Sequence, residues 1–227
     1  MRTAAVLPVK SFARAKQRLG ESVADPLRLE LARAMVADVL LALAQTASIE
    51  RTIVVTREAS VAQSAAELGA LVIDDHAEEG QSAAARLGIE RALADGFERV
   101  LCVPGDCPAL DPAELDALLG SPASAPAVTI VPDRHGAGTN GLLLAPPDAI
   151  APSFGPDSCE RHEQLARDAA IDPRVERLSS LLLDIDTGAD LAALRDRLSG
   201  HSARATRTRS VLGRHARPNL ITIATTA

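Results

Sequence analysis

Three carboxylates stand at places in the sequence from which their side chains could converge on a metal ion. Asp106 lies in a Pro-Gly-Asp-Cys-Pro segment after the apolar run 99–103, and Asp184 and Asp186 lie at the end of the apolar run 181–185. Alternate residues of a strand point to the same face, so Asp184 and Asp186 can address one point. Neighbouring like charges are costly unless a cation lies between them, and hard oxygen ligands favour Mg²⁺. The simpler alternatives are that Asp106 is a turn residue and that Asp186 caps a helix. Capping explains Asp184 less well.

A second candidate for chemistry is a short basic stretch near the start of the chain. Of the 24 Lys and Arg residues only Lys10 and Lys16 are Lys, and Arg18 follows them closely. An ammonium is a compact point charge that fits among crowded phosphate oxygens beside a metal, whereas guanidinium is a wide planar fork. The stretch follows the first apolar run, residues 4–7, and α/β folds hold polyphosphates at the end of a first strand. We therefore predict a phosphate-binding loop here. The alternative is that the two Lys residues fall close together by chance in an Arg-rich chain.

Two further segments are suited to receiving an anion. Residues 135–141 contain three Gly, which let backbone N–H groups approach a ligand closely, although a plain hairpin turn would use the same glycines. In residues 154–162, Gly155 and Ser158 precede a predicted helix, and a helix N-terminus favours a carboxylate or phosphate. Ordinary N-capping by Asp157 or Ser158 explains this second segment equally well.

Strands and helices that would position these residues alternate over the first half of the chain. Asp25-Pro26 predicts the start of a long helix, with Asp25 as N-cap and apolar residues at helical spacing as far as Leu43. This alternation predicts a parallel sheet with helices on both faces. The expected strands are residues 4–9, 51–56, 71–73 and 99–103, and two further helices, 58–68 and 82–95, end at glycines.

After Asp111 the pattern changes. Residues 127–131 and 141–145 are strand-like and are separated by only the Gly-rich loop, so we predict an antiparallel pair. The whole is an α/β fold with a mixed, mostly parallel sheet, in which a nucleotide-binding half precedes an acceptor-binding half. We also expect a helix at 158–168, a last strand at 181–185, a helix at 187–198, one domain over 1–199, and a loosely ordered basic tail over 200–227 in which 220–223 could pair as a strand.

Composition narrows the classes of function. At 47% apolar, 227 residues suffice for one domain with a substantial core. Five Arg and no acid follow Gly200, so the rest of the chain carries a formal charge of −11 within the total of −6, and an acidic body is a poor general binder of nucleic acid. Three Cys without a Cys-x-x-Cys pair argue against disulfides and structural zinc. The sequence shows no signal-peptide pattern and no apolar run of bilayer length, so we expect a cytoplasmic protein.

Five motifs occur in order along the chain: residues 7–10 with 15–19, 104–108, 138–140, 154–158 with His162, and 184–187. Together they resemble the guanylyltransferases of deazaflavin coenzyme biosynthesis, which join GMP from GTP to phosphoenolpyruvate or 2-phospho-L-lactate. The resemblance covers nearly all of residues 3–198. It implies a three-layer α/β/α fold like that of nucleotide-diphospho-sugar transferases. By position it assigns metal ions to Asp106, Asp184 and Asp186, and the carboxylate and phosphate region of the acceptor to Thr139, Gly155 and Ser158.

The function expected from this resemblance is that of a Mg²⁺-dependent guanylyltransferase. Lys10, Lys16 and Arg18 would neutralise phosphate charge together with the metal ions. Phosphoenolpyruvate is the expected acceptor, because the Ala- and Arg-rich composition resembles the actinobacterial branch, whose members use it. The alternatives are 2-phospho-L-lactate as acceptor, another nucleotidyltransferase of the same fold, and a noncatalytic nucleotide-binding protein. The segment Gly80-Gln81-Ser82 departs from the Gly-Leu-Asn-like start expected there, which leaves the guanine contacts unassigned, and a homodimer is one option for the oligomeric state.

Overall fold

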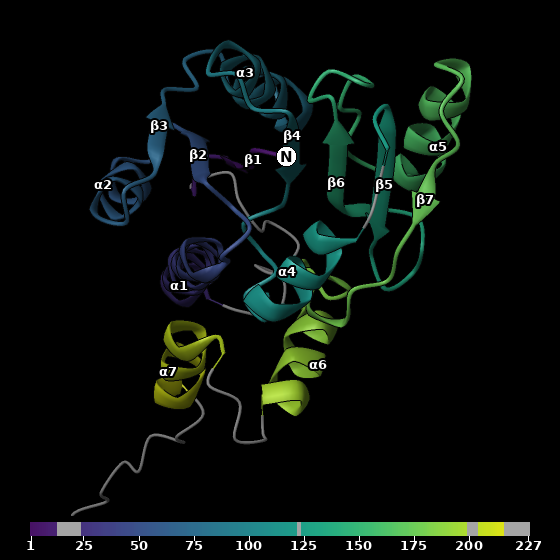
Figure 1. Cartoon of the computed structure of the whole chain (residues 1–227). Helices are drawn as coiled ribbons and strands as arrows, with labels where there is room; N and C mark the ends of the chain where they lie inside the picture. Colours follow the sequence, from purple (N-terminus) through teal and green to yellow (C-terminus); the bar gives the residue numbers. More distant parts are fainter. Residues whose placement is uncertain (13–23, 122–123, 199–203, 216–227) are drawn as a thin grey trace, which may run out of the picture.

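The computed structural model describes residues 1–12, 24–121, 124–198 and 204–215, in which one twisted sheet is flanked by helices (Figure 1). Its seven strands lie in the order β3-β2-β1-β4-β6-β5-β7. The strands are β1 (Thr3–Val9), β2 (Arg51–Thr56), β3 (Leu71–Ile73), β4 (Arg99–Cys102), β5 (Ala127–Pro132), β6 (Thr139–Ala145) and β7 (Arg174–Val175). The helices are α1 (Asp25–Gln45), α2 (Ala59–Glu67), α3 (Gln81–Ala94), α4 (Pro112–Gly120), α5 (Ser158–Asp168), α6 (Gly188–Leu198) and α7 (Thr206–His215).

The mixed, mostly parallel sheet predicted from the sequence is confirmed. β1 pairs in parallel with β2 and β4, and β2 with β3, whereas β6 runs antiparallel to both β4 and β5. From β1 the chain first builds outward to β2 and β3 and then returns to place β4 on the other side of β1. Ligands of open α/β sheets bind at such a switch point, beyond the carboxyl ends of the strands.

Two apolar layers cover the faces of the sheet and follow from the alternation of side chains along each strand. Leu7 of β1 points into a core shared with α1, α2 and α4, whereas Val6 points into a core shared with α3 and α5. Gly88 in the middle of α3 lets that helix lie directly on β1, since a Cβ there would come within 2.4 Å of a Val6 methyl carbon. The result is the three-layer α/β/α arrangement.

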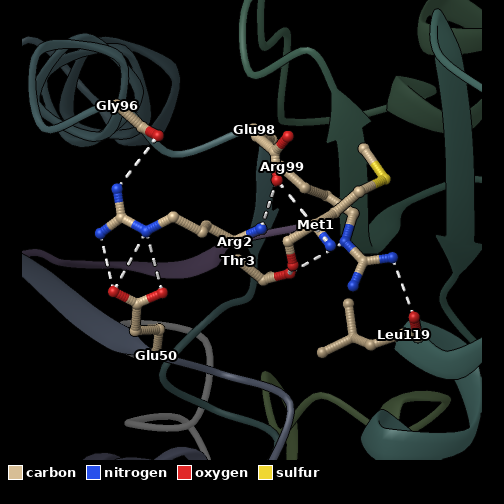
Figure 2. A network of polar contacts seen from close by, with 8 residues as sticks. All are labelled: Met1, Arg2, Thr3, Glu50, Gly96, Glu98, Arg99 and Leu119. Carbon is tan, nitrogen blue, oxygen red and sulfur yellow. Dashed lines mark hydrogen bonds and ion pairs between the residues drawn. The ribbon is translucent and has the colours of Figure 1, made fainter.

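A polar network lies at the amino-terminal ends of the central strands, opposite the carboxyl ends where the switch point is (Figure 2). Arg2 donates to both carboxylate oxygens of Glu50 before β2 and to the Gly96 carbonyl after α3. The buried Arg99 donates to Thr3 Oγ1 at 2.9 Å and to the Leu119 carbonyl of α4 at 2.9 Å. These contacts connect β1, β2, β4 and two helices at the end of the sheet away from the predicted site.

Two expectations about the elements are wrong, and one helix was not predicted. Residues 181–185 are not a strand: a 3-10 helix (Ser179–Leu181) is followed by residues that the structure assigns to no helix or strand, although Leu181, Leu183 and Ile185 are buried. The helix α4 was not predicted, although Asp111-Pro112 repeats the cap signal used for α1 and Asp111 does accept from the Ala113 N–H at 3.0 Å. At α1 the cap position is held by Ala24, and Asp25 is the first helical residue.

The expectation of a tail without helices is also wrong for Thr206–His215, which form α7 on the outer side of α1 (Figure 1). Asp38, buried in the middle of α1, accepts from the backbone N–H groups of Arg207 and Thr208 at 3.1 and 2.8 Å. An acidic side chain from another helix thus caps α7. Residues 216–227, including the proposed strand 220–223, lie outside the described ranges. No helix in those ranges is long and apolar enough to cross a membrane.

Candidate functional site

A cleft of about 600 Å³ opens at the switch point of the sheet. It lies at the carboxyl ends of β1 and β4, at the start of the antiparallel β6, and at the amino ends of α3 and α5. Lys16 and Arg18 lie outside the described residues. The other seven predicted site residues all line this cleft: Lys10, Asp106, Thr139, Gly155, Ser158, Asp184 and Asp186.

Lys10 leaves the end of β1 and is exposed in the cleft. The chain is fixed just beyond it, because the Phe12 N–H donates to Glu58 Oε1 at 2.6 Å and the Phe12 carbonyl accepts from Arg28 of α1 at 3.4 Å. The buried Phe12 ring packs in the core below. A flexible ammonium is therefore presented from an anchored backbone, as a phosphate-binding loop requires.

The other two predicted metal ligands act electrostatically on Asp184. Burial raises the pKa of Asp184, and the negative charges of Asp106 and Asp186 raise it further, against a hydrogen bond from Asn140 that lowers it. The Ile185 N–H donates to the Asp106 carbonyl at 3.2 Å, which joins the two loops that carry the carboxylates. The described residues contain no ready-made cluster of three or more His, Cys, Asp or Glu side chains around a metal position.

This donor set nevertheless fits a hard divalent cation. Half-buried carboxylates that repel one another gain from a cation between them. Mg²⁺ in particular takes one or two carboxylates and completes its coordination with waters and substrate phosphates, so it does not require a closed protein cage. The assignment of Asp106, Asp184 and Asp186 as ligands stays a prediction that the geometry permits.

Two consecutive residues of β6 reach opposite sides of the sheet and contact different parts of the site. Asn140 donates to the Leu181 carbonyl at 2.7 Å and to Asp184 Oδ1 at 3.2 Å. Thr139 lies on the other side, with its Oγ1 3.0 Å from Nδ1 of His162 on α5. The alternation of a strand thus links the carboxylates to the segment predicted to hold the acceptor. The role of Asn140 was not predicted, since it depends on how β6 lies against residues 179–184.

Asp186 is positioned by a reciprocal cap at the start of α6. Asp190 Oδ2 accepts from the N–H groups of Asp186 and Thr187 at 3.2 and 2.8 Å, and Thr187 Oγ1 accepts from the Asp190 N–H at 3.3 Å. Burial alone would raise the pKa of Asp190, but these hydrogen bonds and the ion pair with Arg134 lower it, so its carboxylate is held ionised. Thr187, rather than Asp186, is therefore the capping residue. The Thr-x-x-Asp spacing was a signal in the sequence that could have identified Asp190.

The Gly-rich loop between β5 and β6 does not offer its amides to a ligand in the way the sequence suggested. The N–H groups of His135 and Ala137 donate to Asp133 Oδ1 at 3.0 and 3.1 Å, so the loop already encloses a carboxylate of its own. Gly138 is needed because a Cβ there would lie 2.8 Å from Asp133 Oδ2. The hairpin-turn interpretation holds for most of this loop, and the loop is tied to α5 by the Cys159 N–H, which donates to the Ala137 carbonyl at 3.0 Å.

The amino end of α5 lies at the cleft and has no side-chain cap. Asp157 occupies the cap position in a left-handed conformation, with φ of 54°, but its side chain makes no capping hydrogen bond. Gly155 has φ of 120°, which favours glycine, and Ser158 is buried at 1% exposure with no hydrogen-bond partner for its Oγ among the described residues. The alternative of ordinary capping by Asp157 or Ser158 is thus not supported. The N–H groups of Ser158 and Cys159 already donate to the Gly155 and Ala137 carbonyls at 3.2 and 3.0 Å, so it is the unpartnered Ser158 hydroxyl beside the positive end of the helix that suits an anionic group.

Comparison with known proteins shows which family the chain resembles along its length. A model of the family described as CofC-like guanylyl transferases matches residues 3–211, so the match continues into α7, beyond the expected end of the resemblance. The chain is 47% identical to a phosphoenolpyruvate guanylyltransferase of Conexibacter woesei over 220 residues, which are 96% of this chain and 99% of that protein. It is 36% identical to a phosphoenolpyruvate guanylyltransferase of Sphaerobacter thermophilus, over 89% of this chain and 95% of that protein.

Solved structures of lower identity share the fold. A protein of Desulfovibrio desulfuricans described as a nucleotide-diphospho-sugar transferase superposes with a TM-score of 0.76 at 19% identity, over 95% of this chain and 96% of that one. A nucleotidyl transferase of Methanothermobacter superposes with a TM-score of 0.65 at 20% identity, over 86% of this chain and 97% of that one. The fold is thus that of nucleotide-diphospho-sugar transferases, and the chain belongs to the family of CofC-like guanylyl transferases.

Proposed function

We propose that this protein transfers GMP from GTP to the phosphate of phosphoenolpyruvate and releases pyrophosphate, as a step of deazaflavin coenzyme biosynthesis. A phosphate oxygen of the acceptor attacks the α-phosphorus of GTP, and a new P–O–P bond forms. The bond between the α-phosphorus and the oxygen bridging it to the β-phosphorus breaks, and pyrophosphate leaves with that electron pair. Oxidation states do not change, and no covalent enzyme intermediate is needed.

The observation that carries this proposal is the pairing of two kinds of group on β6. Asn140 donates to Asp184, on the side of the predicted metal ligands, and the preceding residue, Thr139, contacts His162 in the first turns of α5. A transferase must hold nucleotide phosphates and an anionic acceptor next to each other with the reacting oxygen in line. In the proposed site, neighbouring residues of β6 would serve the carboxylates on one side and the anionic acceptor on the other.

Some of the described residues would bind the substrates, and others would neutralise phosphate charge. Lys10 would neutralise phosphate oxygens of GTP, whereas Thr139, Ser158 and the amino end of α5 would receive the acceptor's carboxylate and phosphate region. Asp106, Asp184 and Asp186 would hold Mg²⁺, which when bound supplies Lewis-acid stabilisation of the charge on the transferring phosphoryl group. Catalysis is then positioning and electrostatic stabilisation by a preorganised site.

The test is a product analysis with separate acceptors. Parent protein, GTP and Mg²⁺ are combined with phosphoenolpyruvate, with 2-phospho-L-lactate or with no acceptor, and pyrophosphate and the guanylylated acid are quantified by enzymatic coupling and mass spectrometry. We expect one pyrophosphate per guanylylated phosphoenolpyruvate, none without acceptor, and little turnover when ATP or CTP replaces GTP. Efficient turnover with 2-phospho-L-lactate alone would reverse the acceptor assignment. Binding of GTP without pyrophosphate release under any condition would indicate a noncatalytic nucleotide-binding protein.

Lys10→Arg is predicted to lower kcat/KM at least tenfold. The planar guanidinium cannot replace a compact charge among crowded oxygens, and a loss of ~1.4 kcal/mol in transition-state stabilisation corresponds to that factor. Initial rates of pyrophosphate release measure it. The matched control is Arg51→Lys, which exchanges the same two residue types at the exposed start of β2, outside the cleft, and should leave the rate unchanged. Parent-like activity of Lys10→Arg would show that the preference for Lys at this position has no catalytic meaning.

A further inference from the structure

His162 on α5 is completely buried, at 0% exposure, and each of its ring nitrogens has one partner. The backbone N–H of Ser153 lies 2.9 Å from Nε2, and Thr139 Oγ1 lies 3.0 Å from Nδ1. A backbone N–H can only donate, so Nε2 must accept and carries no proton. A neutral imidazole then has its proton on Nδ1, which donates to Thr139 Oγ1.

The surroundings of the ring keep it neutral. Burial lowers the pKa of His162 to about 4, and the positive charge of Arg161 contributes to the same shift. The ring-packing and hydrogen-bond partners that the described residues supply are uncharged: Phe154 packs edge-on with its centroid 5.2 Å away, and Ser153 and Thr139 are the hydrogen-bond partners. Protonation of Nε2 would set its N–H against the N–H of Ser153, so geometry and charge favour the same tautomer.

This tautomer determines what Thr139 can offer a ligand. A hydroxyl has one hydrogen and two acceptor lone pairs, and one lone pair of Thr139 is used by His162. Thr139 lines the cleft, and among the described residues its side chain has no other hydrogen-bond partner. Its hydrogen is therefore left to donate into the cleft. With the opposite tautomer the hydroxyl would donate to Nδ1 and present only lone pairs, which repel an anionic oxygen.

A second hydroxyl on the same helix face supports an anion at this position. Ser158 precedes His162 by four residues, so both lie on one side of α5. Ser158 Oγ is buried, lines the cleft and has no hydrogen-bond partner among the described residues. Thr139 and Ser158 therefore face the same part of the cleft with hydroxyl groups that can donate.

We propose that His162 is a positioning residue, which through its Nδ1–H fixes the Thr139 hydroxyl as a donor to an anionic oxygen of the acceptor substrate. The inference rests on the proposed function for the identity of that substrate, but the tautomer and the orientation of the hydroxyl do not depend on it. A hydrogen bond to a charged group contributes enough that its loss should reduce kcat/KM for the acceptor roughly 10- to 100-fold. GTP, which is bound by other groups, should be affected less than about twofold.

Three variants of His162 separate positioning from simple packing. His162→Asn keeps an amide N–H where Nδ1 lies and so retains the donor to Thr139. His162→Gln places an amide oxygen near the position of Nε2 and retains the acceptor for Ser153, but gives up the donor. His162→Leu removes both. We expect the His162→Asn variant to have the kcat/KM of the parent for the acceptor. The His162→Gln and His162→Leu variants should both show the full loss of kcat/KM for the acceptor, whereas their KM for GTP should equal that of the parent.

Thr139→Val completes the test, since it removes the hydroxyl itself. We expect the same loss as in His162→Gln, and no further loss in the double variant, because both changes remove one interaction. Additive losses, or an equal rise in KM for GTP, would overturn the positioning role. Should the parent release no pyrophosphate with either acceptor, the proposed function fails and the kinetic comparison falls with it.

A spectroscopic measurement tests the tautomer independently of activity. In protein labelled with ¹⁵N-histidine, the His162 resonances, assigned by their absence in His162→Asn, should show a protonated Nδ1 and an unprotonated Nε2 at pH 7. Thr139→Val should leave that tautomer in place, because Ser153 still requires an acceptor at Nε2. A protonated Nε2 in the parent would overturn the inference whatever the kinetics show.

Discussion

Asp184→Asn is expected to lower kcat by at least about 10³-fold while the fold is retained. In the proposed site the carboxylate is a metal ligand, and a metal ion contributes several kcal/mol to the stabilisation of charge in the transition state, of which ~4 kcal/mol corresponds to 10³ in rate. Asn has the same shape, and its amide oxygen can still accept from Asn140, which contacts Asp184 Oδ1 at 3.2 Å in the parent. The change is therefore one of charge and metal affinity rather than of packing.

The same substitution should not destabilise the protein, which distinguishes a lost ligand from a damaged fold. Burial and the charges of Asp106 and Asp186 raise the pKa of Asp184, so at pH 7 its ionised form is held at a cost to the folded state. Removal of that charge should leave the free energy of unfolding unchanged or increase it. Urea unfolding without added metal measures this term.

Asp172→Asn is the matched control for both measurements, because Asp172 is exposed beyond the end of α5 and does not line the cleft. We expect its turnover and unfolding free energy to equal those of the parent. Turnover of Asp184→Asn near that of the parent at saturating Mg²⁺ would contradict the assignment of Asp184 as a ligand.

Much of the fold could be predicted from the sequence because local signals and tertiary structure agree there. The strands β1 to β4 lie in short apolar runs, and α5 has the predicted bounds, Ser158–Asp168. The antiparallel β5–β6 pair followed from the shortness of the loop between them. In each case the pattern that sets the element is contained within one short segment.

The failures arise where burial or capping comes from distant parts of the chain. The run 181–185 is apolar because it is buried on two sides: Leu181 faces the core under α1 and α4, whereas Leu183 and Ile185 face the core shared with α6 and α7. Burial on two sides gives an apolar run with or without a strand ladder. The helix α7 has few apolar residues of its own, and its cap is Asp38, some 170 positions earlier in the chain.

For the candidate site, too, local signals could be read from the sequence and distant contacts could not. Residues at strand ends and in motifs could be named from the sequence, and the structure brings every described one to a single cleft. Their supporting contacts could not, because the bond from Asn140 to Asp184 and that between Thr139 and His162 depend on how β6 lies between two other segments. Motifs thus specify which groups meet, whereas packing specifies how they are oriented.

The buried neutral His162 should also make the fold sensitive to acid. Its pKa is lowered to about 4 in the folded protein, against an ordinary value of 6.5, so between these values the unfolded chain binds a proton that the folded protein does not. The contribution to stability is therefore complete above pH 6.5 and is lost as the pH falls toward 4. Integration over that window gives a loss of about 3 kcal/mol in the free energy of unfolding at pH 4.

Urea unfolding of the parent and of His162→Asn at pH 7, 6, 5 and 4 isolates this contribution, since all other titrating groups are common to both proteins. We expect the parent to lose about 3 kcal/mol more than His162→Asn between pH 7 and pH 4, with most of the difference appearing below pH 6. His76→Asn is the matched control: the His76 side chain is 83% exposed, and this variant should follow the parent. Parallel curves for the parent and His162→Asn would mean that the imidazole accepts a proton in the folded state, so Nε2 could not be held as the acceptor of the Ser153 N–H on which the tautomer depends.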